Sequence, residues 1–203
     1  MNVLVFNCGS SSLNARLYEQ DGSAEPRSVA IFKAQNVQTK TSAAPKIHWR
    51  IDDLERSQTF PALTHRDAAA YILGFMEKQR LSVDAVGHRF VHGGDHFQTT
   101  ARIEEDALKK LRACFPLAPI HNPNSYAVIE VCLEKLPEIP QYAVFDTAFH
   151  ANLPPEARAY ALPRELAQKE GYHKVGFHGL SCQYVSARAA EMLNKPLDQV
   201  KLI

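Results

Sequence analysis

A turn rich in glycine and serine, residues 8–12, is the first place where this chain could do chemistry. An apolar run ends at Asn7, Gly9 and three serines follow, and a segment of alternating apolar and polar residues begins at Leu13. Successive backbone N–H groups and hydroxyls in such a turn can hold anionic oxygens. The turn lacks the Gly-Lys-Ser/Thr of a Walker A loop, and the next residues have the period of a strand. By itself, the pattern is more often an ordinary hairpin turn.

A guanidinium and two imidazoles lie at the end of a second predicted strand, residues 85–91. Arg89 follows His88, and His92 precedes two glycines that leave the backbone open. Arginine keeps its charge at any relevant pH and can pair with a carboxylate or a phosphate through two hydrogen bonds. A surface arginine with two incidental histidines explains this segment equally well.

A carboxylate and two further histidines complete the candidates. Asp146 directly follows a short apolar strand, residues 141–145, and a carboxylate in apolar surroundings needs a metal ion or a basic partner. A helix-capping or turn aspartate is the competing interpretation. His178 lies between glycines before a helix, and His121 lies in a loop bounded by prolines. Neither has the spacing of a zinc ligand, and a core or capping histidine is the usual alternative.

The elements that position these residues alternate between strands and helices. Apolar periodicity predicts a first hairpin on either side of residues 8–12, then strands over 28–33, 47–51, 85–91 and 141–145, and helices over 66–79, 104–113, 124–135 and 181–193. Residues 152–163 are expected to form a loop. This order predicts a mixed sheet flanked by helices such as 66–79 and 181–193. Residues 39–61 are assigned less firmly, because the sequence also allows them to form a small appendage around the 47–51 strand.

Composition excludes several classes of partner. The 203 residues carry 23 basic and 22 acidic side chains, a net charge of +1, so we expect neither a nucleic acid nor a membrane as partner. No apolar run approaches the length of a spanning helix, and no secretory signal is visible. Four cysteines far apart in sequence indicate reduced thiols and a cytoplasmic protein.

Five motifs, taken in order, resemble the acetate kinase family, which belongs with sugar kinases, Hsp70 and actin. The motifs are Asn7-Cys-Gly-Ser-Ser-Ser12, His88-Arg-Phe-Val-His-Gly-Gly94, Ala118-Pro-Ile-His-Asn-Pro123, Val144-Phe-Asp-Thr-Ala-Phe-His150 and Gly176-Phe-His-Gly179. The resemblance runs along the whole chain. It implies an α/β, ribonuclease-H-like (actin-like ATPase) lobe with a mixed sheet. It also implies reversible phosphoryl transfer between ATP and acetate, giving ADP and acetyl phosphate, with Mg²⁺ or Mn²⁺.

The resemblance also implies roles for single residues. Arg89 would bind carboxylate or phosphoryl oxygens, Asp146 would orient the acyl substrate and the metal, and His178 would stabilise the phosphoryl group during transfer. His121 would support His178. We therefore expect Asn7, Arg89, His121, Asp146 and His178 to face one cleft.

Two further sets follow from the resemblance. The phosphate and metal side of the first hairpin would consist of Asn7, Ser10 and Ser12, with Asn7 and Asp146 as the metal candidates. The small apolar pocket for the acetate methyl group would consist of Val91, Ile120 and Phe177. Four positions depart from the family pattern, namely Asn14 in place of Lys, Asp95 in place of Glu, Leu180 in place of Thr and Cys182 in place of His. These departures leave the main catalytic candidates intact.

Length sets a further expectation. Family enzymes have two related lobes, and this chain ends where the second would begin, so we expect residues 1–203 to be the N-terminal, acyl-substrate lobe. The C-terminal nucleotide lobe would then be absent, the isolated chain inactive, and the full-length enzyme a homodimer. Two alternatives stay open: a propionate or butyrate kinase, and a non-catalytic binding module that reuses half of the fold. The reading frame beyond Ile203 distinguishes the enzyme from the module.

Overall fold

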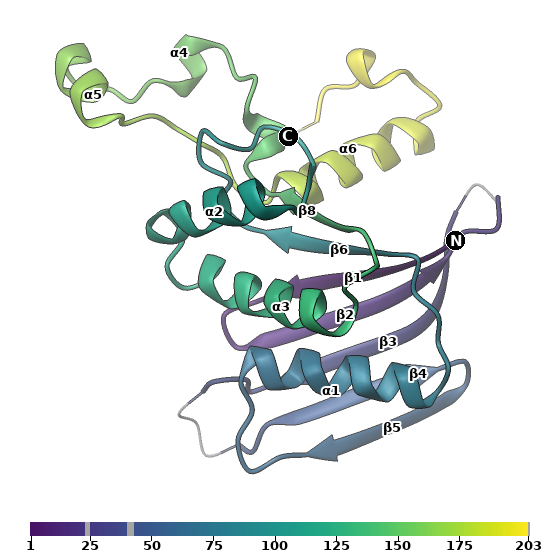
Figure 1. Cartoon of the computed structure of the whole chain (residues 1–203). Coiled ribbons are helices and arrows are strands. Elements are labelled where there is room, and N and C mark those ends of the chain that lie inside the picture. The colour runs from purple at the N-terminus through teal and green to yellow at the C-terminus, as the bar shows by residue number, and fades with distance from the viewer. Residues whose placement is uncertain (23–24, 40–42, 203) are drawn as a thin grey trace. The chain divides into compact units, whose positions relative to one another are not determined.

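The computed structural model describes residues 1–22, 25–39 and 43–202. They fall into two compact units (Figure 1), of which unit 1 comprises Met1–Phe90 and Ala101–Val144, and unit 2 comprises Val91–Thr100 and the chain from Phe145 onward. Within these described ranges, no helix is both long and apolar enough to cross a membrane. Each unit therefore has its own packing, and the candidate residues are divided between the two.

Unit 1 is built on a mixed sheet, as the sequence predicts. Its described strands are β1 (Asn2–Cys8), β2 (Ser12–Glu19), β3 (Arg27–Gln35), β4 (Lys46–Ile51), β5 (Leu54–Thr59), β6 (Ala85–Phe90), β7 (Ala101–Arg102) and β8 (Gln141–Phe145). They are ordered β5-β4-β3-β2-β1-β6-β8-β7. β1 is antiparallel to β2 and parallel to β6. It therefore lies between the antiparallel strands β2 to β5 on one side and the strands β6, β8 and β7 on the other.

Helices cover one face of this sheet (Figure 1). α1 (His65–Lys78) and α3 (Asn122–Lys135) pack against each other and against the central strands, and α2 (Glu105–Ala113) packs on α3. α1 begins with a capping box, because the Thr64 hydroxyl accepts from the Asp67 N–H while the Asp67 carboxylate accepts from the Thr64 N–H. This reciprocal pair fixes the start of α1 at His65.

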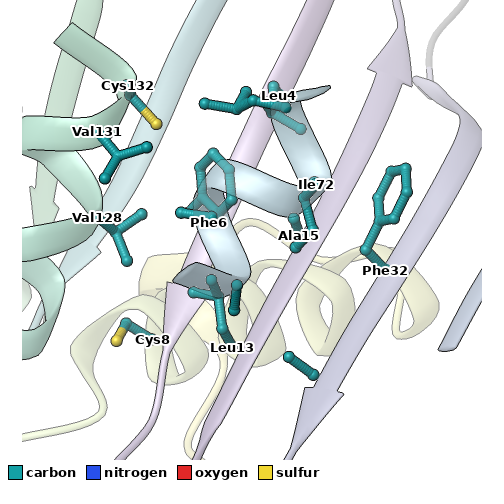
Figure 2. Packing of buried hydrophobic residues seen from close by; sticks show 14 of the residues in the cluster. Leu4, Phe6, Cys8, Leu13, Ala15, Phe32, Ile72, Val128, Val131 and Cys132 are labelled. Atoms are coloured by element: carbon teal, nitrogen blue, oxygen red, sulfur yellow. The ribbon is translucent and has the colours of Figure 1, made fainter. Parts of the chain in front are cut away.

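Alternation along the strands builds the core between sheet and helices (Figure 2). Leu4 and Phe6 of β1 point toward Ile72 of α1 and Val128 of α3, and all four side chains are almost fully buried. Burying a side chain of this size contributes roughly 1.5–3 kcal/mol to folding. Because successive strand residues point to opposite faces, the side chain of Asn7, which follows Phe6, lies on the sheet face that these helices leave open.

Residues 39–61 do not form a separate appendage where they are described. They supply β4 and β5, which extend the main sheet antiparallel to β3, and residues 40–42 lie outside the described residues. Every residue of β5 is exposed, so the sequence offers no apolar alternation to reveal it. Backbone pairing with β4 holds this strand in place, because none of its side chains is buried.

Unit 2 is mainly helical. It contains α4 (Pro155–Arg158), α5 (Arg164–Glu170) and α6 (Gly179–Met192), with short 3₁₀ turns at Ala148–His150 and Leu197–Gln199. α4 lies within residues expected to form a loop, and α5 lies where no element is predicted, because neither helix buries a residue. The helix predicted over 181–193 is present as α6 and belongs to unit 2. The helices that pack on the sheet of unit 1 are α1 and α3.

Candidate active site

The turn between β1 and β2 is tightly closed. The Gly9 N–H donates to the Ser12 carbonyl at 2.8 Å, and a Cβ at position 9 would lie 2.7 Å from the Ser12 Oγ. Only glycine fits this close approach without a shift of the serine side chain. The two strands consequently meet in a compact loop with Ser10 and Ser11 at its exposed tip.

Two carbonyl groups of this turn are bonded by residues outside it. The Ser11 carbonyl accepts from the Val37 N–H at 3.0 Å, and the Gly9 carbonyl lies 2.9 Å from the Nε2 of His65. Across residues 1–22, 25–39 and 43–202, no protein acceptor bonds the N–H of Ser10 or of Ser11. Adjacent N–H donors of this kind form a concavity suited to an oxyanion. The arrangement supports the anion-binding interpretation of the turn.

Arg89 lies beside this turn on the neighbouring strand. β1 and β6 pair so that Phe6 is opposite His88, which places Asn7 and Arg89 next to each other on the open face of the sheet. The Arg89 Nη1 donates to the Asn7 Oδ1 at 3.0 Å, across 82 positions of sequence. The sheet thus brings together two of the residues that the sequence predicts for one site, at the strand end that carries the turn.

A second cation lies on the same face of the sheet. The strand register sets Asn7 opposite Asn14, and Asn14 opposite Lys33 of β3. Directly opposed residues on an antiparallel pair have Cβ atoms about 5 Å apart. Lys33 therefore supplies an ammonium group beside Asn14, the position at which this chain departs from the lysine of the family pattern.

His121 and Ile120 lie in unit 1 just before α3. His121 occupies the N-cap position, where its backbone N–H donates to the Ala118 carbonyl at 3.0 Å, and its side chain is half-buried. Ile120 is 63% exposed. An apolar side chain with this exposure is available to a ligand, although unit 1 alone does not enclose it.

Asp146 and His178 are linked within unit 2. Asp146 is buried, at 1% exposure, and its carbonyl accepts from the Gly179 N–H at 2.9 Å. His178 precedes Gly179 and adopts a φ of +56°. This value lies in the left-handed region, which residues other than glycine and asparagine rarely occupy. Strained backbone of this kind concentrates at functional sites. The predicted meeting of these two residues with Asn7, Arg89 and His121 of unit 1 stays a prediction.

The hydrogen bond from the Gly179 N–H to the Asp146 carbonyl requires a residue without a side chain at position 179. A Cβ at position 179 would overlap the Asp146 carbonyl oxygen, so Gly179→Ala should separate α6 from residue 146 and destabilise the protein by about 1–3 kcal/mol in urea unfolding. Gly74→Ala is the matched control, since a Cβ there meets nothing within 4 Å and should stabilise α1 by about 0.5–1 kcal/mol. Equal stability of Gly179→Ala and wild type would show that the contact is not tight.

The predicted methyl pocket is divided between the units. Val91 is 8% exposed and Phe177 is 46% exposed, and both belong to unit 2. The Phe177 ring meets the His92 ring edge to face, with centroids 5.7 Å apart, so this contact joins the loop after β6 to the turn before α6. Within unit 2 the structure thus places Phe177 beside His92, the residue after Val91, and a pocket formed by Val91, Ile120 and Phe177 stays a prediction.

The candidate metal ligands of this chain suit an ion that is also bound by water and by the phosphates of a nucleotide. In the described ranges, no group of three His, Cys, Asp or Glu side chains could by itself hold a metal ion. Mg²⁺ commonly takes one or two protein carboxylates and fills its sphere with water and substrate phosphates. Asp146 offers such a carboxylate. The Asn7 amide oxygen, which accepts from Arg89, retains a second lone pair. Each fits as a partial ligand of a metal–nucleotide complex.

His88 differs from its neighbour Arg89, because its side chain points into the core. It stacks on Phe6 with centroids 5.8 Å apart and shares a 2.9 Å hydrogen bond between its Nε2 and the Gln141 Oε1. No partner for its Nδ1 occurs in the described part of the chain. Burial lowers the pKa of His88 to about 4, and a proton on Nδ1 would find no acceptor. His88 is therefore a neutral core residue.

This buried histidine predicts an acid sensitivity. Because the folded pKa of about 4 lies below the ordinary 6.5, the unfolded state binds the proton first, and stability is lost as pH falls through that window. The free energy of unfolding should be about 2 kcal/mol lower at pH 5 than at pH 7. Urea titrations of wild type and His88→Leu measure this, and the variant should lose distinctly less. The same loss in both would assign the acid sensitivity elsewhere.

Known proteins match this chain along its whole length. A model described as the Acetokinase family matches residues 2–203. The chain is 39% identical over 213 aligned residues to the acetate kinase of Thermoanaerobacterium thermosaccharolyticum, covering 100% of this chain and 51% of that protein. It spans about half the length of the curated relatives it matches.

Solved structures agree as well. The acetate kinase of Entamoeba histolytica superposes with a TM-score of 0.80 at 39% identity, covering 95% of this chain and 46% of that one. A propionate kinase from Francisella tularensis gives a TM-score of 0.84 at 36% identity, covering 96% and 49%. These likenesses, together with the mixed sheet flanked by helices, confirm the predicted ribonuclease-H-like α/β fold. The chain belongs to the acetokinase family.

Proposed function

We propose that this chain is the acyl-substrate lobe of an acetate kinase, which transfers a phosphoryl group reversibly between ATP and acetate. The observation that carries the proposal is in unit 1, where the Arg89 guanidinium bonds to Asn7 beside a turn whose Ser10 and Ser11 N–H groups meet no acceptor among the described residues. Fixed cations and preorganised N–H donors are what a transferring phosphoryl group requires. Family membership supports the same reaction.

The reaction needs positioning more than acid–base help. An oxygen of acetate attacks the γ-phosphorus while the bond from that phosphorus to the bridging oxygen of ATP breaks, so acetyl phosphate forms and ADP leaves. Acetate is already ionised at neutral pH and needs no general base. Arg89 orients carboxylate or phosphoryl oxygens, and the N–H groups and hydroxyls around Ser10 and Ser12 stabilise charge on the transferring group.

The residues of unit 2 and the metal complete the proposal. Asp146 orients the acyl substrate and contributes a carboxylate toward Mg²⁺ or Mn²⁺, Asn7 contributes an amide oxygen, and His178, supported by His121, stabilises the phosphoryl group in flight. The metal, when bound with ATP or ADP, would neutralise charge on the phosphate oxygens. A homodimer is a prediction from the family resemblance, and a cytoplasmic location is a prediction from the four scattered cysteines.

A hydroxamate assay tests the function. The complete gene product, given ATP, Mg²⁺ and acetate, should form acetyl phosphate that hydroxylamine traps, and acetyl phosphate with ADP should regenerate ATP. We expect residues 1–203 alone to turn over far more slowly. No trapped product from the complete gene product would contradict the proposal, and rapid turnover by residues 1–203 would contradict the division of roles between the lobes.

Propionate is the second candidate substrate, because the propionate kinase of Francisella tularensis superposes on this chain with a TM-score of 0.84. One methylene in an apolar pocket changes discrimination by about 10–200-fold. The same assay with acetate, propionate and butyrate ranks the values of kcat/KM. A preference for propionate or butyrate over acetate would reassign the substrate, and binding of acetyl phosphate without any turnover would favour a binding module.

A further inference from the structure

The ring of His65 forms an unassigned connection between α1 and the turn of residues 8–12. His65 is the first residue of α1 and is 1% exposed. Its Nε2 lies 2.9 Å from the Gly9 carbonyl, and its Nδ1 lies 2.9 Å from the Gln38 Oε1. No motif marks this residue, and 56 positions of sequence separate it from Gly9.

We propose that His65 is a positioning residue, which holds the Gly9 carbonyl toward the protein and thereby keeps the N–H group of Ser10 available to a phosphoryl or phosphate oxyanion. The proposal rests on the proposed function of the turn. His65 is not a catalytic residue, because it acts on the ligand only through the backbone of Gly9.

The geometry of the turn explains why one carbonyl matters. A peptide plane carries its C=O and the next N–H on opposite sides, so fixing the Gly9 carbonyl fixes the direction of the Ser10 N–H. The Ser11 carbonyl accepts from the Val37 N–H, and this bond fixes the following peptide plane, which carries the Ser12 N–H. His65 is therefore the side chain that fixes the plane presenting the Ser10 N–H at the tip of the turn.

His65 is itself held rigidly. The Thr64–Asp67 capping box fixes the first turn of α1, and the Gln38 N–H donates to the Leu63 carbonyl at 2.9 Å, which anchors the segment on the other side of the ring. Burial lowers the pKa of His65, so the ring is neutral near pH 7. A neutral imidazole has a single N–H, and the Nε2–H tautomer donates it to Gly9. Its Nδ1 is then an acceptor. The Gln38 amide fits this tautomer when it is turned by about 180°, so that its nitrogen donates to Nδ1.

Three variants of residues 1–203 separate positioning from general stability. His65→Leu removes the donor, His65→Gln retains an N–H that can reach the Gly9 carbonyl, and Ile72→Val removes one methyl group from the buried face of the same helix. Two quantities are measured near pH 7.5. They are the ¹⁵N order parameter of the Ser10 amide in the free protein, and the dissociation constant for inorganic phosphate, both obtained from ¹H–¹⁵N spectra.

We expect His65→Leu to lower the order parameter of the Ser10 amide and to bind phosphate about tenfold more weakly, the effect of one lost hydrogen bond. His65→Gln should recover most of both losses, and Ile72→Val should match wild type. An unchanged order parameter in His65→Leu would overturn the proposal, as would equal losses in Ile72→Val or a lower order parameter with unchanged phosphate affinity. If wild type itself does not bind phosphate, the proposed function of the turn fails. The order parameters then decide the role of His65 alone.

Discussion

Arg89→Ala should lower kcat/KM for acetyl phosphate formation by about 100- to 1000-fold in the complete gene product. The change removes a fixed charge from the half-buried position beside the turn and leaves the Asn7 amide oxygen without its guanidinium donor. Arg89→Lys should recover only part of the activity, because an ammonium group keeps the charge but loses the planar fork that binds two oxygens. The trapped hydroxamate measures both.

The control for Arg89 is another arginine on the same sheet face. Arg16 of β2 is exposed and hydrogen-bonds the Tyr18 hydroxyl at 3.3 Å, away from the pairing of Asn7 with Arg89. Arg16→Ala should leave kcat/KM within about threefold of wild type, as expected for a solvated surface charge. An equal loss in both variants would show that net charge, and not the placement of Arg89, drives the effect.

Asp146→Asn should cause a similar loss, about 100-fold or more in kcat, with the fold unchanged. The amide has nearly the shape of the carboxylate and can still hydrogen-bond at a buried position, but it brings no negative charge to a metal–nucleotide complex. The loss should therefore be accompanied by a higher Mg²⁺ requirement. Asp198→Asn, at an exposed position of unit 2, is the control. Full activity of Asp146→Asn at ordinary Mg²⁺ concentrations would remove Asp146 from the mechanism.

Much of unit 1 could be predicted from periodicity. Alternation in β1 and β2 separates the core residues Phe6 and Leu13 from Asn7 on the open face, and the four-residue spacing within α1 marks the side that packs on the sheet. The two strands and the turn between them form a local unit, so their pairing needs no information from distant sequence.

Other features depend on contacts that local patterns do not encode. β5 carries only exposed side chains and exists because β4 offers it a ladder of hydrogen bonds. The bond from His65 to Gly9 joins two segments that meet only after the sheet and α1 have formed. His88 lies in the core, whereas its neighbour Arg89 lies on the open face, because α1 and α3 cover only one face of the sheet.

Binding of phosphoryl oxygens by Arg89 and the turn of residues 8–12 can be measured by titrating ¹⁵N-labelled residues 1–203 with acetyl phosphate. We expect saturable shifts of the Ser10 and Ser11 amides and of the Arg89 side-chain Nε resonance, all with one dissociation constant. Arg89→Ala should weaken the binding seen at both serines, and Arg16→Ala should not. Shifts confined to other parts of the folded chain, or no shift at saturating ligand, would show that Arg89 and this turn do not bind the phosphoryl group.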